Sequence, residues 1–195
     1  MSWLRPGILA INRVIEGVKS RWRNVYYRTL GVKLHGYVWM RHIEIPRNFA
    51  DIEIESPCAL DRGVILLTTG ELLPHPKIHI GANTYINRHT FLDAILSLTI
   101  GKNCGIGPNC YITDHDHGHD PTLAPLEQPM IAKPTQIGDC VWLGANVIIL
   151  KGVTIGDRTI VGAGSVVTHD LPPNAIAVGV PARVIKHRNL STEDP

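Results

Sequence analysis

The sequence predicts an all-β protein coiled from short parallel strands, and three observations support this. An aliphatic residue recurs at every sixth position through long stretches of the chain from Ile80 onward. The position four residues further along is restricted to Thr, Ser, Cys, Val or Leu. A glycine directly follows many of the leading aliphatics, as in Ile100–Gly101. Six residues make one short strand and a turn, so three such units close a triangular coil around an apolar column.

The phase of the repeat divides the chain into coils. We expect coils at residues 80–97, 100–136, 137–154 and 155–172, with less regular turns upstream from about Ile43. Cys104 and Cys110 fall at inward positions of the repeat and are expected in the core. Cys140 does not fall at an inward position. The Pro-rich segment LPPNAIAVGVPARVIKHR follows the last coil and is expected to cover the exposed end of the stack. The predicted β-helix domain is 34–188, with a tail at 189–195.

Composition narrows the class of protein. The chain has 195 residues, 44% of them hydrophobic, and a formal net charge of +2, which is typical of one globular domain. Residues 1–33 hold seven basic residues and one acidic residue, so the remainder has a net charge of −4. This argues against nucleic-acid binding by the main domain. Four cysteines without CxxC spacing favour a reducing compartment, and we expect the cytoplasm.

The basic head, residues 1–33, is predicted to be an amphipathic helix. Its apolar residues are spaced alternately by four and three positions, namely Leu4, Ile8, Ile11, Ile15, Val18, Trp22 and Val25. One interpretation is that this stripe packs on the β-helix of the same chain or on copies of itself. A second is that it makes peripheral contact with the anionic inner face of a membrane. Binding to another partner is the third.

An inserted loop interrupts the repeat. After Ile112 the period places the next aliphatic at position 118, but it comes only at Ile137, so the loop covers about 114–136. It begins TDHDHGHD, the densest group of titratable residues in the chain. Histidine exchanges protons near neutral pH, so an acid–base site is expected here. Two alternatives stay open, a metal bound by the HxHxH run and a simple solvated loop.

The segment IHIGANTYINRHTFLDAILSLTIGKNCGIGPNCYITDHDHGHD and the tail GAGSVVTHDLPPNAIAVGVPARVIK resemble the hexapeptide-repeat acyltransferases. The resemblance covers about 50–188 and is greatest to maltose and galactoside O-acetyltransferases and to acetyltransferases of surface-polysaccharide clusters. It implies a left-handed parallel β-helix, a homotrimer, and acetyl-CoA as co-substrate without a metal. It also implies that the acceptor is a hydroxyl of a sugar or a lipid-linked saccharide.

The resemblance further implies site residues. His117 is implied as the general base of a direct transfer, with His115 in reserve because the DHDH run departs from the family pattern. Asn87 and Asp93 match acceptor-binding positions. Positions that match contacts to acetyl-CoA are Trp142, Gly144, Ala145, Gly162, Ala163, Thr168, His169 and Arg183. The alternatives are a metal-dependent hydratase like the γ-carbonic anhydrases and a non-catalytic structural subunit. The tail argues against the former, and the His loop against the latter.

Overall fold

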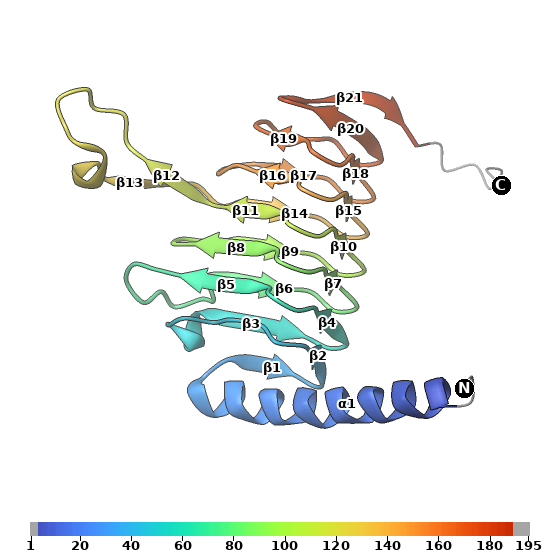
Figure 1. The fold of residues 1–195 in the computed structure, drawn as a ribbon. Helices are drawn as coiled ribbons and strands as arrows, with labels where there is room; N and C mark the ends of the chain where they lie inside the picture. Colours follow the sequence, from blue (N-terminus) through green and yellow to red (C-terminus); the bar gives the residue numbers. More distant parts are fainter. Residues whose placement is uncertain (1–3, 189–195) are drawn as a thin grey trace.

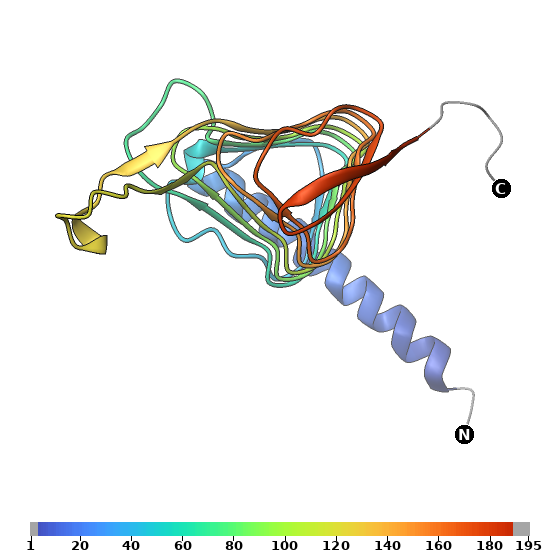
Figure 2. The same ribbon diagram turned by 90° about the horizontal axis from the view of Figure 1, so that it is seen from above.

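A computed structural model describes residues 4–188, with side chains from residue 11 onward, and shows a parallel β-helix standing on one long helix (Figure 1). The coils form a triangular prism with three parallel sheets as its faces (Figure 2). The helix, α1, spans Leu4–Leu30 and lies across the N-terminal end of the prism. The predicted fold class is confirmed.

The first face is a six-stranded sheet. Its strands, in spatial order, are β1 (Lys33–His35), β3 (Ile52–Glu55), β6 (Ile78–Ile80), β9 (Leu98–Ile100), β14 (Thr135–Ile137) and β17 (Thr154–Ile155). A short 3-10 helix, η1 (Phe49–Asp51), precedes β3. The outward side chains of this face form a polar column, namely Lys33, Glu53, His79, Thr99, Gln136 and Thr154.

The second face is an eight-stranded sheet. It contains β2 (Val38–Met40), β4 (Cys58–Leu60), β7 (Tyr85–Ile86), β10 (Gly105–Ile106), β15 (Trp142–Leu143), β18 (Ile160–Val161), β20 (Ala175–Gly179) and β21 (Ala182–His187). The antiparallel pair β20–β21 closes the stack, as the Pro-rich segment predicts. Its outward column is largely apolar, namely Trp39, Ala59, Tyr85, Gly105, Trp142 and Ile160.

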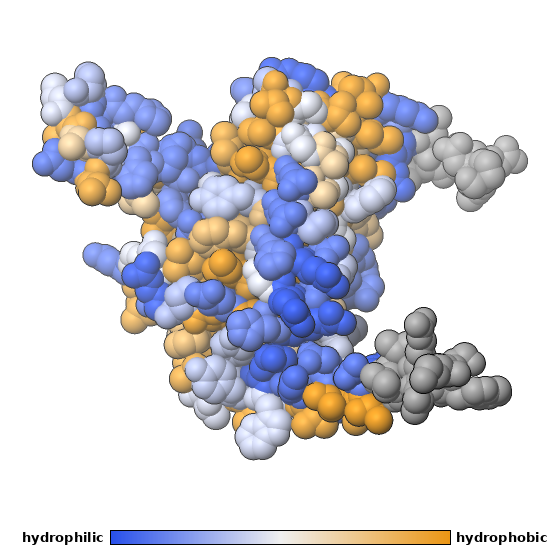
Figure 3. All heavy atoms as spheres, viewed as in Figure 1, coloured by the Kyte–Doolittle hydropathy of each residue, from blue (hydrophilic) through white to orange (hydrophobic). Residues whose placement is uncertain are grey.

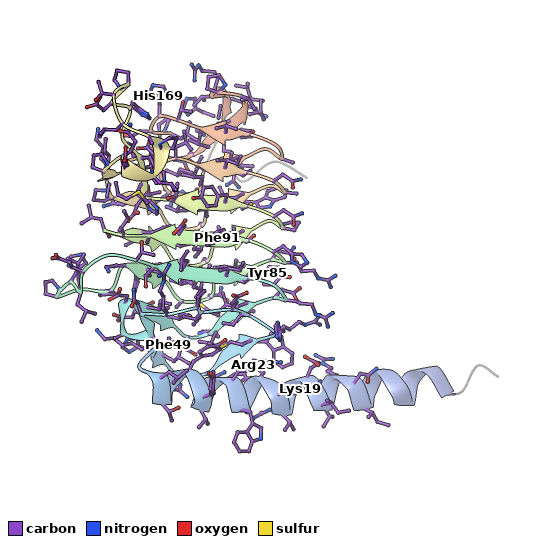
Figure 4. The ribbon with its side chains drawn as sticks, turned by 60° about the vertical axis from the view of Figure 1, so that its left-hand side comes forward. Lys19, Arg23, Phe49, Tyr85, Phe91 and His169 are labelled. Atoms are coloured by element: carbon purple, nitrogen blue, oxygen red, sulfur yellow. The ribbon has the colours of Figure 1, made fainter. Side chains whose placement is uncertain are left out.

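The third face has five strands, β5 (Ile65–Thr68), β8 (Phe91–Ala94), β11 (Tyr111–Thr113), β16 (Ile148–Ile149) and β19 (Val166–Val167). Its outward column is also apolar, namely Ile65, Phe91, Tyr111, Ile148 and Val166. Figure 3 shows hydrophobic side chains gathered over β5, β8 and β11, beside a hydrophilic band in the middle of the view. Tyr85 and Phe91 mark the second and third faces in Figure 4.

The repeat forms the core as predicted. The leading aliphatics are all buried, with at most 2% exposure, namely Ile80, Ile86, Leu92, Ile100, Ile106, Ile112, Ile137, Leu143, Ile149, Ile155, Val161 and Val167. Cys104 and Cys110 are buried beside them, as expected. Leu96 is a correction, because it is only partly buried while Ala94 and Leu98 are fully buried. The leading aliphatics Leu92 and Ile100 are eight positions apart instead of six, which changes which residues point inward at this corner.

The basic head is not a separate unit. Tyr27 in α1 and Val32, which follows the helix, belong to the hydrophobic core, and the first strand begins at Lys33. The predicted interpretation that the apolar stripe packs on the β-helix is wrong for the described residues. Ile11, Ile15, Val18, Trp22 and Val25 are exposed. Leu4 and Ile8 lie outside the residues whose side chains are described.

Candidate active site

The long insertion leaves the prism after β11 and returns at β14, at the edge where the third face meets the first. It is more ordered than a plain loop, because β12 (His115–His117) and β13 (Met130–Ala132) pair as an antiparallel hairpin, with η2 (Pro125–Glu127) between them. Figures 1 and 2 show this arm projecting away from the coils. The residues at its base are therefore anchored by the β-helix, while its tip extends outward.

At the base of the arm, His115 and Asp114 form a buried pair. His115 Nδ1 lies 2.9 Å from Asp114 Oδ1, and because a carboxylate only accepts, Nδ1–H is the donor. His115 is 8% exposed and Asp114 is fully buried. The backbone N–H of His115 also donates to Thr113 Oγ1 at 3.2 Å. These bonds fix the ring so that Nε2 is the nitrogen available for chemistry.

Asp114 is held by the corner of the coil below. Its carboxylate accepts hydrogen bonds from the backbone N–H groups of Ile95, Leu96 and Ser97 at 3.0, 2.7 and 2.6 Å. Burial alone would raise the pKa of Asp114, but the bond from His115 and these three amide bonds outweigh it and lower that pKa. Asp114 is therefore a fixed anion beside the imidazole.

A second carboxylate faces the other side of the ring. Asp93 Oδ2 lies 3.9 Å from His115 Nε2 and accepts a hydrogen bond from Tyr111 Oη at 3.2 Å. Burial raises the pKa of Asp93 despite the nearby imidazole and the tyrosine. The pKa of His115 is also raised, chiefly by its hydrogen bond to Asp114 and further by the charge of Asp93, against the opposing effect of burial. The imidazole is thus a stronger base than an isolated histidine.

The other histidines of the arm are placed differently. His117 lies two residues further along β12 and is exposed, and His119 beyond it is exposed too. Asp116 pairs with Lys151 of the coil above rather than with a histidine. Within the described part of the chain, no three His, Cys, Asp or Glu side chains are grouped to hold a metal ion. The HxHxH run therefore does not converge on one point in this structure.

The structure places the two residues of the acceptor-side prediction differently. Asp93 lies beside His115, with 3.9 Å between its Oδ2 and His115 Nε2. Asn87 lies at the corner after β7, where its Oδ1 accepts a hydrogen bond from the N–H of Arg88 at 2.8 Å. That bond is sufficient to explain an Asn at this corner.

The residues predicted to contact acetyl-CoA fall into two groups. Trp142 is 58% exposed on β15, and Gly144 and Ala145 follow it. A Cβ on Gly144 would lie 2.6 Å from the backbone nitrogen of Ala163, so coil stacking alone requires glycine there. Gly162 and Ala163 occupy the equivalent corner of the next coil.

The second group lies at the C-terminal end of the prism, where His169 is labelled in Figure 4. Thr168 Oγ1 lies 2.8 Å from His169 Nδ1. His169 and Arg183 line one groove of about 300 Å³, together with Asp170, Leu171, Ala182 and Val184. The sequence match thus joins residues from two segments that are adjacent in space.

Sequence reasoning missed several members of the site. Asp114 belongs to the charged cluster that the sequence indicates, and an Asp directly before a His at the end of a strand is a signal for this pairing. Nothing in the sequence indicates that Tyr111 or Lys151 lies near the site. Tyr111 occupies an ordinary repeat position, and Lys151 lies in a different coil. Only the stacking of coils brings them to the same edge.

Comparisons with known proteins agree with this architecture. The family model for the bacterial transferase hexapeptide (six repeats) matches residues 134–169, and that for the hexapeptide repeat of succinyl-transferase matches 97–114. Galactoside O-acetyltransferase of Escherichia coli K12 is 44% identical over 115 residues, covering 58% of this chain and 55% of that protein. The chain matches between 53% and 58% of the length of the first three curated relatives.

Two solved structures are similar over more of their length. A hexapeptide-repeat acetyltransferase from Vibrio cholerae O1 biovar eltor, complexed with acetyl-coenzyme A, superposes with a TM-score of 0.60 at 30% identity, covering 86% of this chain and 76% of that one. A maltose O-acetyltransferase from Clostridium difficile 630 has a TM-score of 0.59 at 32% identity, covering 86% and 75%.

Proposed function

This chain belongs to the hexapeptide-repeat acetyltransferases, and we propose that it transfers an acetyl group from acetyl-CoA to a hydroxyl of a saccharide. The observation that carries the proposal is the buried Asp114–His115 pair at the base of the inserted arm. Two similar proteins are named for acetylating sugars, galactosides and maltose. A saccharide acceptor is the class that these names support.

We assign the general base to His115 ahead of His117. His115 is buried, bonded through Nδ1 to a fixed carboxylate, and has a raised pKa, whereas His117 is exposed on the arm. In the neutral ring Nε2 carries a lone pair, so it accepts the proton of the acceptor hydroxyl. Asp114 holds the tautomer and stabilises the imidazolium that forms. Asp93, 3.9 Å from Nε2, is placed to orient the hydroxyl.

The acetyl group is then transferred directly from the thioester to the acceptor hydroxyl. The hydroxyl oxygen attacks the thioester carbonyl carbon as its proton passes to His115 Nε2, giving a tetrahedral intermediate. The carbon–sulfur bond breaks, and the imidazolium returns the proton to the departing thiolate. The products are an O-acetyl ester and free CoA thiol, so no covalent enzyme intermediate is required. The amide of Gly144 already donates to the Val161 carbonyl, so we assign oxyanion stabilisation to the amide of Ala145 in a neighbouring copy of the chain.

A trimer would complete this site. Trp142 lies on the second face, whereas His115 lies at the edge between the third and first faces, so one prism does not bring them together. The second and third faces have apolar outward columns, and the first face has a polar one. Burying two adjacent faces of each prism around a threefold axis leaves the polar face in water. The third face of one copy then meets the second face of the next.

The direct test measures thiol release from acetyl-CoA with a panel of mono- and disaccharides, and identifies the acetylated product by mass. The proposal expects stoichiometric CoA thiol and acetyl ester with at least one sugar, unchanged by chelators. Release of CoA thiol that yields free acetate and no acetylated sugar, or no thiol release with any sugar of the panel, would contradict the proposal.

A further inference from the structure

Helix α1 carries its apolar stripe on the side that faces away from the β-helix. The described apolar residues of the helix are exposed by 38% or more except Tyr27, namely Ile11, Val14, Ile15, Val18, Trp22, Val25, Tyr26 and Leu30. Trp22, at 71%, is the most exposed of them. Figure 3 shows part of this surface as an orange patch at the lower edge of the molecule, next to the grey residues, and Figure 1 shows that α1 forms that end. The described side chains of the stripe are therefore accessible for contact with a flat surface outside the molecule.

The exposure is fixed by how the helix attaches. Its buried side is polar and completes the hydrogen bonds of β2. Ser20 Oγ accepts from the N–H of Met40 at 2.9 Å, and Asn24 Oδ1 accepts from the N–H of Val38 at 3.0 Å. Tyr27 Oη donates to the Ile43 carbonyl at 3.1 Å. Rotating the stripe inward would break all of these buried bonds, so the β-helix itself cannot cover it.

Lys19 and Arg21 lie three or four positions from members of the stripe and so border it, and further positive charge lies on the coil-facing side of the helix. Between Leu4 and Leu30 the helix contains six basic residues and one acidic residue, Glu16, which already pairs with Lys19 at 3.2 Å. A groove of about 350 Å³ between the helix and the lower coils is lined by Lys19, Arg23, Arg41, His42 and Arg62, with Glu16. Asp61 offsets Arg41 from 3.5 Å. Figure 4 shows Arg23 on the helix side that faces the coils.

We propose that α1 docks this end of the molecule onto an anionic lipid surface. An apolar stripe bordered by basic side chains matches a membrane interface, with acyl chains beneath Trp22 and lipid phosphates beside the basic residues. The charge argues against a second copy as the occupant. Two copies of this helix would place like charges together with one acidic residue each to offset them. No helix of the described chain is long and apolar enough to cross a membrane.

Assembly would strengthen the contact. In a trimer whose threefold axis runs along the prisms, three α1 helices lie at the same end and meet one surface together. Once one helix is bound, the other two are held near the membrane at a high effective concentration. The trimer therefore binds with higher affinity than a single helix. The docking itself does not depend on acetyl transfer, and its test is separate from enzyme activity.

The experiment uses the full-length protein, because deleting the helix would remove Tyr27 and the β2 hydrogen bonds from the folded body. We would measure co-sedimentation with vesicles of phosphatidylcholine alone and with about one third phosphatidylglycerol. The expected result is binding to the anionic vesicles at least tenfold tighter than to the neutral ones, and weaker binding as salt is raised.

Variants identify the surface. Val18→Ser with Trp22→Ser should weaken binding at least tenfold, because both side chains are exposed apolar members of the stripe. The matched control is Leu72→Ser with Leu126→Ser, which removes exposed apolar side chains, 78% and 96% exposed, from two loops away from α1. Lys19→Gln with Arg21→Gln should weaken binding to anionic vesicles, whereas Lys186→Gln on β21 should not.

Three outcomes would overturn the proposal. They are failure of the wild type to bind anionic vesicles, equal binding to neutral vesicles, and equal losses in the stripe and control variants. If the stripe variant instead changes only the mass of the protein in solution, without any vesicle binding by the wild type, the stripe is a contact between copies.

Discussion

At the residue scale, the proposed general base is distinguished by the groups that surround His115, above all the Asp114 carboxylate. The insertion after Ile112 indicates where the cluster of histidines and aspartates lies. His115 and His117 are two positions apart in it and differ in the groups that surround them. That difference is made by Asp114 and by the three amides of the preceding coil. These amides belong to residues 95–97, which are far from His115 in the chain. A local sequence pattern therefore could not predict their hydrogen bonds to Asp114.

Asp114→Asn tests the pair. Loss of the carboxylate removes the largest cause of the raised His115 pKa, so that pKa should fall. Because the neutral imidazole is the base, kcat/KM rises with pH through the His115 pKa, and this acidic limb should move to lower pH in the variant. The rate on the plateau should fall by roughly 10²-fold or more, since the tautomer is no longer held. An unmoved limb would contradict the assignment.

Cys140→Asn tests a turn. Cys140 is exposed and adopts a left-handed backbone conformation, with φ of 58°, at the corner where the two coils below have Asn83 and Asn103. Asn tolerates this conformation better than other residues with a Cβ. We expect the free energy of unfolding to rise by on the order of 0.5 kcal/mol. Cys104→Asn, at a buried core position, should instead destabilise the fold in the same denaturation assay.

At the element scale, the period of six predicted the coils, because it marks which residues point into the core, and the Pro-rich segment predicted the closing strands. The same reasoning went wrong for α1. A helical apolar stripe is normally the packing face, but here the polar residues Ser20 and Asn24 pack, because they complete the edge of β2. Helical periodicity identifies a two-sided helix without saying which side is attached.

Lys77→Met tests how β6 is anchored. The Lys77 side chain is fully buried and its Nζ lies 2.9 Å from Asp51 Oδ2 and 2.8 Å from the Thr69 carbonyl. Removing one member leaves a buried carboxylate alone, so we expect a loss of about 3–5 kcal/mol in unfolding free energy. Lys77→Met with Asp51→Leu should recover most of that loss. A double variant as unstable as the single one would contradict this explanation.

At the scale of the whole molecule, a single chain contains the proposed general base, but it does not bring that base together with the residues proposed to bind acetyl-CoA. The period of six concerns only the inward residues, so it does not predict that two faces of the prism are apolar and one is polar. The outward columns depend on register between coils, such as Tyr111 with Ile148 and Gly105 with Trp142. The comparisons place the chain in a family; the faces indicate how copies would assemble.

Ile148→Asp tests the assembly. Ile148 lies on the third face and is 36% exposed, so a charge there would be buried between copies of a trimer. Light scattering should give the trimer mass for the wild type and a smaller mass for the variant. Gln136→Asp, on the polar first face, should keep the trimer mass. A monomeric wild type at micromolar concentration would contradict the shared site.

The central claim is that His115, held by Asp114, removes the acceptor proton. Its most direct test is the kcat for acetyl transfer of His115→Ala compared with that of His117→Ala, with acetyl-CoA binding and thermal unfolding measured on both. We predict a loss of roughly 10²–10⁴-fold for His115→Ala and a much smaller loss for His117→Ala, with acetyl-CoA binding retained in both. A larger loss at His117 would contradict the account.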